Sequence, residues 1–578
     1  MNSETKQCQN CKKNFTIEPD DFGFYEKIKV PPPTFCPECR MIRQFLFRNE
    51  KNLYKHDCMV PGHDEKLISI YSPTSPMTVY DTNYWWGDKW DPISYAQEYD
   101  FSQNFFKQYH NLQEKVPRPP LVNNQAVNSE YCNFADQNKD CYLITSANRN
   151  ENSFYGFGLI GNKNISDCLW CSDSELVYEC IDCIKCYDLK NSQQCENCVS
   201  SAFLFDCRGC NNCLFSTHLR NKSYYVFNKQ YSKEQYLEIF KDLNGDYKKY
   251  KEMVDKFDVF KKESSMRKSA NILKSVNAIG DNIFSSKNIN QGFDIYNSED
   301  SSYLEEGLKA QSCYDVCFFE NTELCYESIS LIGYGYFFTM YCRDSRNIFY
   351  CDNCHACSEC FGCVSLHKKS YCILNKQYTK EEYEKLLPKI IKHMDAMPYV
   401  DAKGRIYKYG EFFPSELSPF AYNETIAQEY FPLTKKEAIA RGYKWKDKEE
   451  RNYAIDIKNE DIPNDIKYVN DSVIGKVLEC AHQGKCNEQC TEAFKLIPNE
   501  LIFYQKMNLP LPRLCPNCRH YQRLNQRNPL KLWHRTCMCN KQNHAHGENN
   551  CDVEFETPYA PERTEIVYCE KCYQQEVY

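Results

Sequence analysis

The cysteines near the N-terminus of this 578-residue chain are spaced as metal ligands. Cys8 and Cys11 form a C-x2-C pair, and Cys36 and Cys39 form a second pair after 24 intervening residues. Each pair can lie on a tight turn, and two such turns can complete a tetrahedron of thiolates around a zinc ion. The spacing therefore predicts a structural zinc site in this segment.

The same arrangement recurs near the C-terminus. The peptide CPNCRHYQRLNQRN, which begins at Cys515, repeats CPECRMIRQFLFRN, which begins at Cys36, after a shift of 479 residues. Here Cys486 and Cys490 replace the first pair with one extra residue between them, and Cys518 completes the predicted ligand set. In both copies the segment between the pairs predicts strand, turn and strand, and the proline after the third cysteine predicts the start of a helix.

A further group of potential ligands follows in the C-terminal copy. A C-x-C and a C-x2-C pair most simply make another four-cysteine zinc site. Its predicted ligands are Cys537, Cys539, Cys569 and Cys572, with His544, His546 and Cys551 between the pairs as spare or alternative ligands.

The N-terminal copy lacks part of this group. Cys58 matches Cys537, but Asp81 and Tyr84 stand where the last two cysteines should be, so Cys58 and His63 are interpreted as remnants. We therefore predict that the second metal has been lost there, and that the chain binds three zinc ions in all.

The pattern C-x2-C-x3-F, then F-Y, then C-P-x-C-R resembles the probable zinc-ribbon family. The resemblance covers about forty residues at each end and implies zinc on the two primary cysteine sets, although the spacing of Cys486 and Cys490 departs from the pattern. The whole chain also resembles long cysteine-rich proteins of unknown function from uncultivated bacteria with small genomes. That wider resemblance implies no mechanism.

Composition limits the classes of protein. The chain has 37 cysteines and a formal net charge of -8, so no overall attraction to nucleic acid is implied. The N-terminal peptide MNSETKQCQNCKK contains no apolar segment, and no run of about 18 apolar residues occurs, so we predict neither secretion nor membrane association. We expect a cytoplasmic protein, in which clustered thiols are more often metal ligands or packing groups than disulfides.

The central cysteines belong to a second repetition. Residues 206–236 match residues 353–383 at a constant shift of 147, and each copy ends in a capping-box signal for a helix. In the first half, C-x2-C pairs begin at Cys168, Cys180, Cys195 and Cys207, at steps of 12, 15 and 12. Short strands at such steps predict a solenoid. Its thiols either fill a narrow β-coil or form a run of zinc or iron-sulfur sites, and the sequence leaves both open.

These patterns predict a multidomain, β-rich chain with α insertions, in which zinc-ribbon or treble-clef-like modules flank a duplicated cysteine-rich β-solenoid. The predicted segments are an N-terminal zinc-ribbon module with a degenerate second site (1–120), solenoid half 1 (121–231), a helical insertion (232–285), solenoid half 2 (286–378), a helix and aromatic linker (379–470) and a C-terminal double zinc-ribbon module (471–578).

No P-loop, H-E-x-x-H or G-x-S-x-G motif occurs, and we predict no enzymatic activity and identify no small-molecule substrate. Closed all-cysteine sites are typical of structural zinc. We expect a solenoid scaffold that binds protein partners. One alternative is an RNA- or DNA-binding protein that uses Arg519, Arg523 and Arg527, which share one helical face. Another is a metal-cluster or thiol redox protein.

Overall fold

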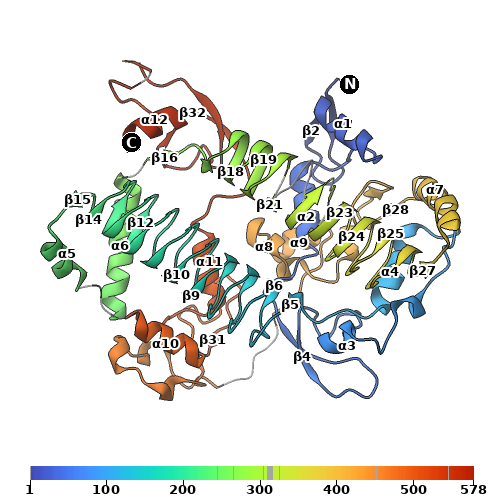
Figure 1. Ribbon diagram of the computed structural model, residues 1–578, viewed down its shortest axis with the longest axis horizontal. Coiled ribbons are helices and arrows are strands. Elements are labelled where there is room, and N and C mark those ends of the chain that lie inside the picture. Colours follow the sequence, from blue (N-terminus) through green and yellow to red (C-terminus); the bar gives the residue numbers. More distant parts are fainter. Residues whose placement is uncertain are drawn as a thin grey trace.

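A β-solenoid of about 18 turns dominates the computed structural model, and it is built in two halves that follow one another in the chain (Figure 1). The predicted solenoid is therefore confirmed. The structure describes residues 2–241, 243, 245–264, 266–303, 305–308, 317–323, 326–327, 329–448, 454–544, 546–547 and 549–578.

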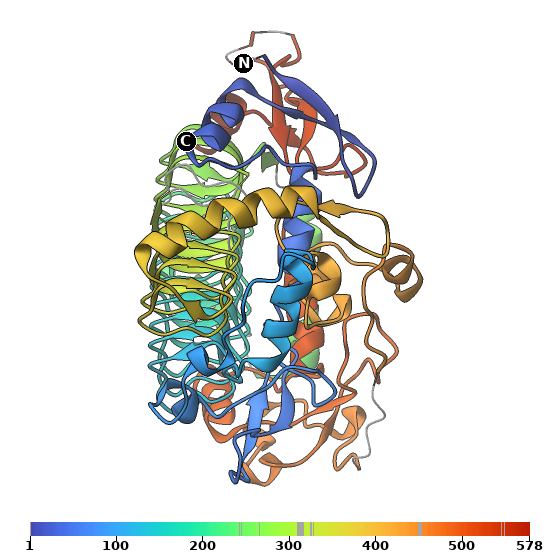
Figure 2. The same ribbon diagram turned by 90° about the vertical axis from the view of Figure 1, so that its right-hand side faces the viewer.

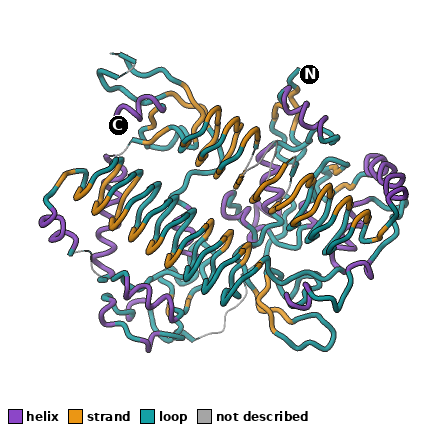
Figure 3. Tube along the Cα trace, viewed as in Figure 1, coloured by secondary structure: helices purple, strands orange, loops and turns teal. Residues whose placement is uncertain are grey.

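The strands of each half stack in parallel, one coil on the next (Figure 3). The first half contains β5 (Asn123–Asn124), β6 (Asn133–Asp136), β7 (Thr145–Asn148), β8 (Phe157–Ile160), β9 (Lys163–Ser166), β10 (Glu175–Tyr178), β11 (Tyr187–Lys190), β12 (Val199–Phe205), β13 (Asn211–Thr217), β14 (Ser223–Val226) and β15 (Lys229–Gln230). Glu175 pairs with Tyr187, which pairs with Val199, so one coil takes 12 residues.

The second half begins at Ile272, inside the segment that the sequence predicted as a helical insertion. Its strands are β17 (Ile272–Leu273), β18 (Val276–Phe284), β19 (Lys287–Tyr296), β20 (Glu299–Ser302), β21 (Glu305–Leu308), β22 (Cys317–Glu323), β23 (Ile329–Phe337), β24 (Arg343–Phe349), β25 (Ser358–Phe361), β26 (Ser370–Ile373) and β27 (Lys376–Gln377).

Each half ends in an antiparallel hairpin, β14 with β15 and β26 with β27. The reversal stops the parallel stacking on this side of the last coil, where two residues of the returning strand pair with it. Helices α5 (Lys233–Phe240) and α7 (Lys380–Ala396) follow at once, and both begin with the predicted capping boxes at Ser232 and Thr379.

Within a coil the backbone repeats every third residue. Asp167, Trp170 and Asp173 have φ values of 55°, 55° and 49°, in the left-handed region, and the residues after the first two, Cys168 and Cys171, are buried inside the coil. Asp and Asn adopt this conformation more readily than most residues, which explains their frequency at the corners. A 12-residue coil thus has four inward positions.

The end modules have the same order of elements except for one additional strand, β34, in the C-terminal module. The N-terminal module contains β1 (Glu4–Gln7), β2 (Asn14–Ile17), α1 (Pro19–Lys27), α2 (Pro37–Phe45), β3 (Tyr54–Asp57), β4 (Lys66–Ser69) and α3 (Thr82–Trp86). The C-terminal module contains β30 (Leu478–Glu479), β31 (Ala493–Phe494), α10 (Pro498–Lys506), α11 (Pro516–Leu524), β32 (Trp533–Thr536), β33 (Glu554–Thr557), β34 (Val567–Tyr568) and α12 (Glu570–Val577).

One local prediction for the modules is wrong and another is confirmed. The second predicted strand between the cysteine pairs is a helix in each copy, α1 or α10, because Pro19 and Pro498 start a helix at its first position. The helix predicted after the second cysteine pair is present as α2 and α11.

The remaining elements lie beside the solenoid, and Figure 2 shows the coils as one layer with the module and linker helices along one side. These elements are α4 (Phe105–Lys115), α6 (Tyr247–Ser264), β16 (Arg267–Lys268), β28 (Tyr399–Val400), β29 (Ile406–Tyr407), α8 (Ile426–Tyr430) and α9 (Lys435–Ala440). None of the helices in the described part of the chain combines the length and apolarity that a membrane span requires.

Candidate metal centres

The four cysteines predicted near the N-terminus meet in space. The sulfurs of Cys8, Cys11, Cys36 and Cys39 all lie within 4.8 Å of one another, and Cys11 Sγ is 3.7 Å from Cys36 Sγ. A Zn–S length of about 2.3 Å places the sulfurs of a tetrahedral site about 3.8 Å apart. The Cys36 backbone N–H also donates to Cys8 Sγ at 3.3 Å, a bond that favours the thiolate. This group could hold a metal ion.

The corresponding C-terminal group differs from the predicted set. The structure brings Cys480, Cys490, Cys515 and Cys518 within 4.8 Å of one another, so Cys480 takes the place predicted for Cys486. The Cys515 N–H donates to Cys480 Sγ at 3.2 Å, as Cys36 does to Cys8. Cys486, the ligand that the sequence predicted, lies beside this group.

The third group also differs by one residue. Its four mutually close sulfurs belong to Cys537, Cys551, Cys569 and Cys572, and Cys551 Sγ is 3.9 Å from Cys569 Sγ. Cys539, which was predicted as a ligand here, lies instead in a neighbouring group with the two histidines and Cys572. The alternative ligand Cys551 therefore fills the central place.

The degenerate N-terminal counterpart has few potential ligands. Cys58 Sγ accepts the Asp81 backbone N–H at 3.3 Å, as Cys537 Sγ accepts that of Cys569 at 3.1 Å. The carboxylate of Asp81 caps α3, and His63 Nδ1 lies 3.2 Å from the Cys58 sulfur. The same backbone hydrogen bond to sulfur is thus present in both copies, although Asp81 and Tyr84 replace two of the cysteines.

Burial affects the protonation of these thiols. It raises the pKa of Cys537 to about 11, and it also raises the pKa of Cys490. A thiol in such a place keeps its proton at neutral pH unless a nearby positive charge favours the thiolate. A bound cation would supply that charge.

The solenoid cysteines have a different environment. The sulfurs of Cys168 and Cys183 each lie within hydrogen-bonding distance of two carbonyls that can share the one S–H, one carbonyl two residues earlier, at 3.3 and 3.4 Å, and one nine residues later, at 3.6 Å. As for Cys537 in the end module, burial raises the pKa of Cys132, to about 12, and that of Cys141, to about 11. Among the described residues, the groups suited to a metal ion all lie in the end modules. These contacts favour the packing interpretation.

The arginines predicted to contact nucleic acid point toward the solenoid instead. Arg519 and Arg523 are both 3% exposed, and each forms an ion pair with a carboxylate oxygen of Asp167, which is fully buried. They therefore cannot contact a phosphate backbone unless these ion pairs break. The predicted nucleic-acid-binding face is a packing face.

The third arginine lies between the two solenoid halves. Arg527 is 9% exposed and pairs with Asp182 of the first half at 3.2 Å and with Asp294 of the second half. Sequence reasoning missed Cys480 as a potential ligand and Asp167, Asp182 and Asp294 as partners of the arginines. The only available signal for Cys480 was its position just before the predicted pair, in LECAHQGKCNEQC.

Comparison of the chain with protein-family models, with curated proteins and with solved structures finds no match. The functional argument therefore rests on the geometry of this structure.

Proposed function

We propose that this chain is a zinc-binding scaffold, in which the end modules hold the two solenoid halves together and the solenoid offers a surface to protein partners. The observation that carries the proposal is the position of Arg527. This single buried guanidinium, just after α11, pairs with acids from both halves. The helix just before it, α11, is N-capped by Cys515, one of the second group of cysteines.

The N-terminal module docks in the same way. Arg43 of α2 is buried and pairs with Glu327 of the second half at 2.6 Å and with Glu411 of the linker at 3.0 Å. The hydrophobic core around Cys36 and Cys39 continues into the second solenoid half. The core around the C-terminal group continues into the first half.

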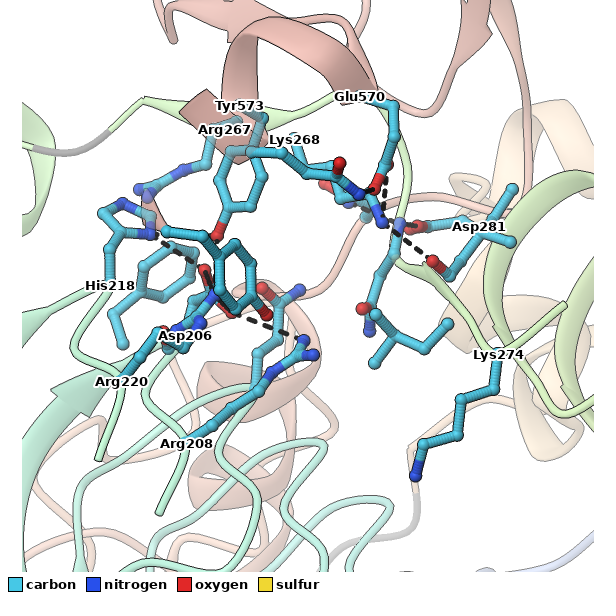
Figure 4. Close-up of a pocket in the computed structure, with 18 of the residues that line it drawn as sticks. Asp206, Arg208, His218, Arg220, Arg267, Lys268, Lys274, Asp281, Glu570 and Tyr573 are labelled. Carbon is cyan, nitrogen blue, oxygen red and sulfur yellow. Dashed lines mark hydrogen bonds and ion pairs between the residues drawn. The ribbon is translucent and has the colours of Figure 1, made fainter. Parts of the chain in front are cut away.

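The last helix adds a third contact (Figure 4). Tyr573 of α12 lies next to Cys572, and its hydroxyl is 3.2 Å from both His218 Nδ1 and Arg220 Nη2 on the solenoid. Glu570 pairs with Lys268 at 2.7 Å. Each group of cysteines thus fixes a helix that contacts the solenoid. Closed cysteine sites with no position for substrate are typical of structural zinc, so this ion fits the proposed role.

A column of outward side chains supplies the proposed partner surface. Parallel pairing at 12-residue steps aligns Lys163, Glu175, Tyr187 and Val199 on one side of the first half. Tyr187 is 46% and Val199 37% exposed. Aromatic side chains are enriched in protein interfaces relative to the rest of the surface, so the exposed Tyr187 supports this assignment.

The partner surface can be tested by photocrosslinking in the cells that produce the protein. A photoreactive phenylalanine analogue replaces Tyr187 in one variant and Tyr468, which is 72% exposed on the linker, in a matched control. We expect a discrete protein adduct at position 187 and none at position 468. No adduct at 187, or the same adducts at both positions, would contradict the proposed scaffold.

A further inference from the structure

Each of the two C-terminal four-cysteine groups shares one cysteine with a second group of potential ligands. In each second group, the four ligand atoms again lie within 4.8 Å of one another. The second groups are His482, Cys486, Glu488 and Cys518, and Cys539, His544, His546 and Cys572. A thiolate has enough lone pairs to bind two cations, so a shared cysteine can bridge two metal ions.

The distances in the first of these groups suit a zinc ion. Cys486 Sγ lies 3.7 Å from Cys518 Sγ, close to the separation of about 3.8 Å for two sulfurs on one zinc. His482 Nδ1 and Glu488 Oε2 are 3.2 Å apart, and two such ligands on one zinc would lie about 3.4 Å apart. Both atoms are buried and form no hydrogen bond within the described part of the chain.

In the second group, one ring nitrogen of each histidine bonds an oxygen, that of Glu576 or of the Asn549 carbonyl, so the other nitrogen can face a metal. His544 Nε2 lies 2.9 Å from Glu576 Oε1, and its Nδ1 is 3.2 Å from Cys539 Sγ. His546 Nδ1 lies 2.7 Å from the Asn549 carbonyl, while its buried Nε2 has no partner among the described residues. A carboxylate or carbonyl bound to the far nitrogen is the usual support of a metal-binding histidine.

The N-terminal module is an internal comparison for the first group. Its Cys39 corresponds to Cys518, and the Cys39 sulfur accepts a hydrogen bond from Asn10 Nδ2 at 3.3 Å. Only two residues separate Cys8 from Cys11, whereas nine separate Cys480 from Cys490. The longer loop supplies the three additional ligands, and among the described residues the N-terminal group has ligands for one ion.

We propose that the two C-terminal groups are thiolate-bridged binuclear zinc centres, with Cys518 and Cys572 as the bridging ligands, so that the chain binds five zinc ions. This inference rests on the proposed function, because it presumes that the four-cysteine groups bind zinc. In the first centre, the thiolate of Cys486 and the carboxylate of Glu488 balance the charge of the added ion. The added site is also more accessible, since these two residues line a groove on the surface.

The test is the zinc content of the full chain, saturated with zinc alone, freed of excess ion and measured by native mass spectrometry and elemental analysis. We expect five ions in the natural chain. The double variant His482→Asn/Cys486→Ser should hold four, and so should His544→Asn/His546→Asn. Asn487→Ala changes a residue in the same loop that is not a proposed ligand, and this control should hold five.

A second measurement on the unaltered chain does not depend on whether the variants fold. X-ray absorption at the zinc edge should contain a zinc–zinc distance of about 3.5–4 Å. Three ions with no zinc–zinc distance would overturn the binuclear centres and leave the proposed function intact. Five ions in either double variant would also overturn them. Fewer than two ions in the natural chain would overturn both proposals.

Discussion

Asp167→Asn should loosen the C-terminal module from the solenoid. The substitution removes the one carboxylate that pairs with both Arg519 and Arg523 and leaves two buried guanidiniums. Loss of one partner of a buried ion pair costs about 3–5 kcal/mol. Glu500, 3.8 Å from Arg519, compensates in part, whereas Arg523 keeps only the Tyr155 carbonyl, at 3.2 Å, among the described residues. We therefore expect Asp167→Asn to destabilise the contact between α11 and the solenoid by about 3 kcal/mol, near the lower limit of that range.

Hydrogen exchange of α11 is the assay, because a chain with several domains need not unfold in one step. A cost of about 3 kcal/mol corresponds to exchange more than about 100-fold faster in this helix. The matched control is Asp173→Asn, which changes an exposed aspartate at the equivalent left-handed corner, where φ is 49° instead of 55°.

A second substitution, which removes one of the unpaired arginines, gives a further test. In Asp167→Asn/Arg523→Met, one of the unpaired cations is gone, so exchange in α11 should slow again relative to the single variant. If Asp167→Asn changes α11 exchange by no more than twofold relative to the Asp173→Asn control, the reasoning about the buried ion pairs is refuted.

Three further predictions concern the metal groups, the pH dependence of stability and the solenoid core. Cys58→Ser should leave the zinc content unchanged, whereas Cys537→Ser should lower it by one ion; loss from both variants would show that the degenerate site still binds metal. Burial lowers the pKa of His355 to about 3. Between pH 6.5 and this value, the histidine is therefore protonated in the unfolded chain and neutral in the folded chain. The free energy of unfolding should therefore fall as the pH falls from 6.5 toward 3, and at pH 5 this residue should account for about 2 kcal/mol of the loss. In denaturation experiments His355→Asn should make the free energy of unfolding depend less on pH. An unchanged slope would contradict this prediction. Cys183→Leu should destabilise the solenoid by about 1–3 kcal/mol through overpacking, more than Cys183→Ala does, and equal melting temperatures would argue against a narrow core.

The solenoid could be predicted from the sequence, because its repeat involves residues that are close in the chain. A 12-residue coil repeats its corner and inward positions, so the spacing of the C-x2-C pairs predicts the solenoid. The finer period of three was hidden, because inward positions carry Cys at 168 and 171 but Ser at 174 and Val at 177. Several small or aliphatic residues fit the same place, so no single residue type marks it.

Ligand sets could be predicted only where the pairs are close in sequence. The N-terminal group has the two short pairs that the pattern requires, and its four sulfurs meet. In the C-terminal copy, a longer loop separates Cys480 from Cys490, so the nearer Cys486 fitted the pattern better. Cys551 was likewise less regular in spacing than Cys539. The spacing of cysteines in the sequence does not show which of them a longer loop brings together.

The role of the arginine helix could not be read from local charge. The basic residues of α11, and Arg527 just after it, predict a solvent-exposed face when only their neighbours in sequence are considered. Their partners Asp167, Asp182 and Asp294 lie in distant solenoid coils, and only the folded chain places them opposite the helix. Long-range pairing of this kind leaves no periodic signal in the sequence.

The central claim is that metal ions hold the end modules against the solenoid, and hydrogen exchange with and without metal tests it most directly. After removal of zinc by a strong chelator at neutral pH, α2 and α11 should lose their protection, while coils such as β10 and β11 keep theirs. Zinc returned to the same sample should restore protection. Unchanged exchange in both helices after complete removal of the metal would contradict the account.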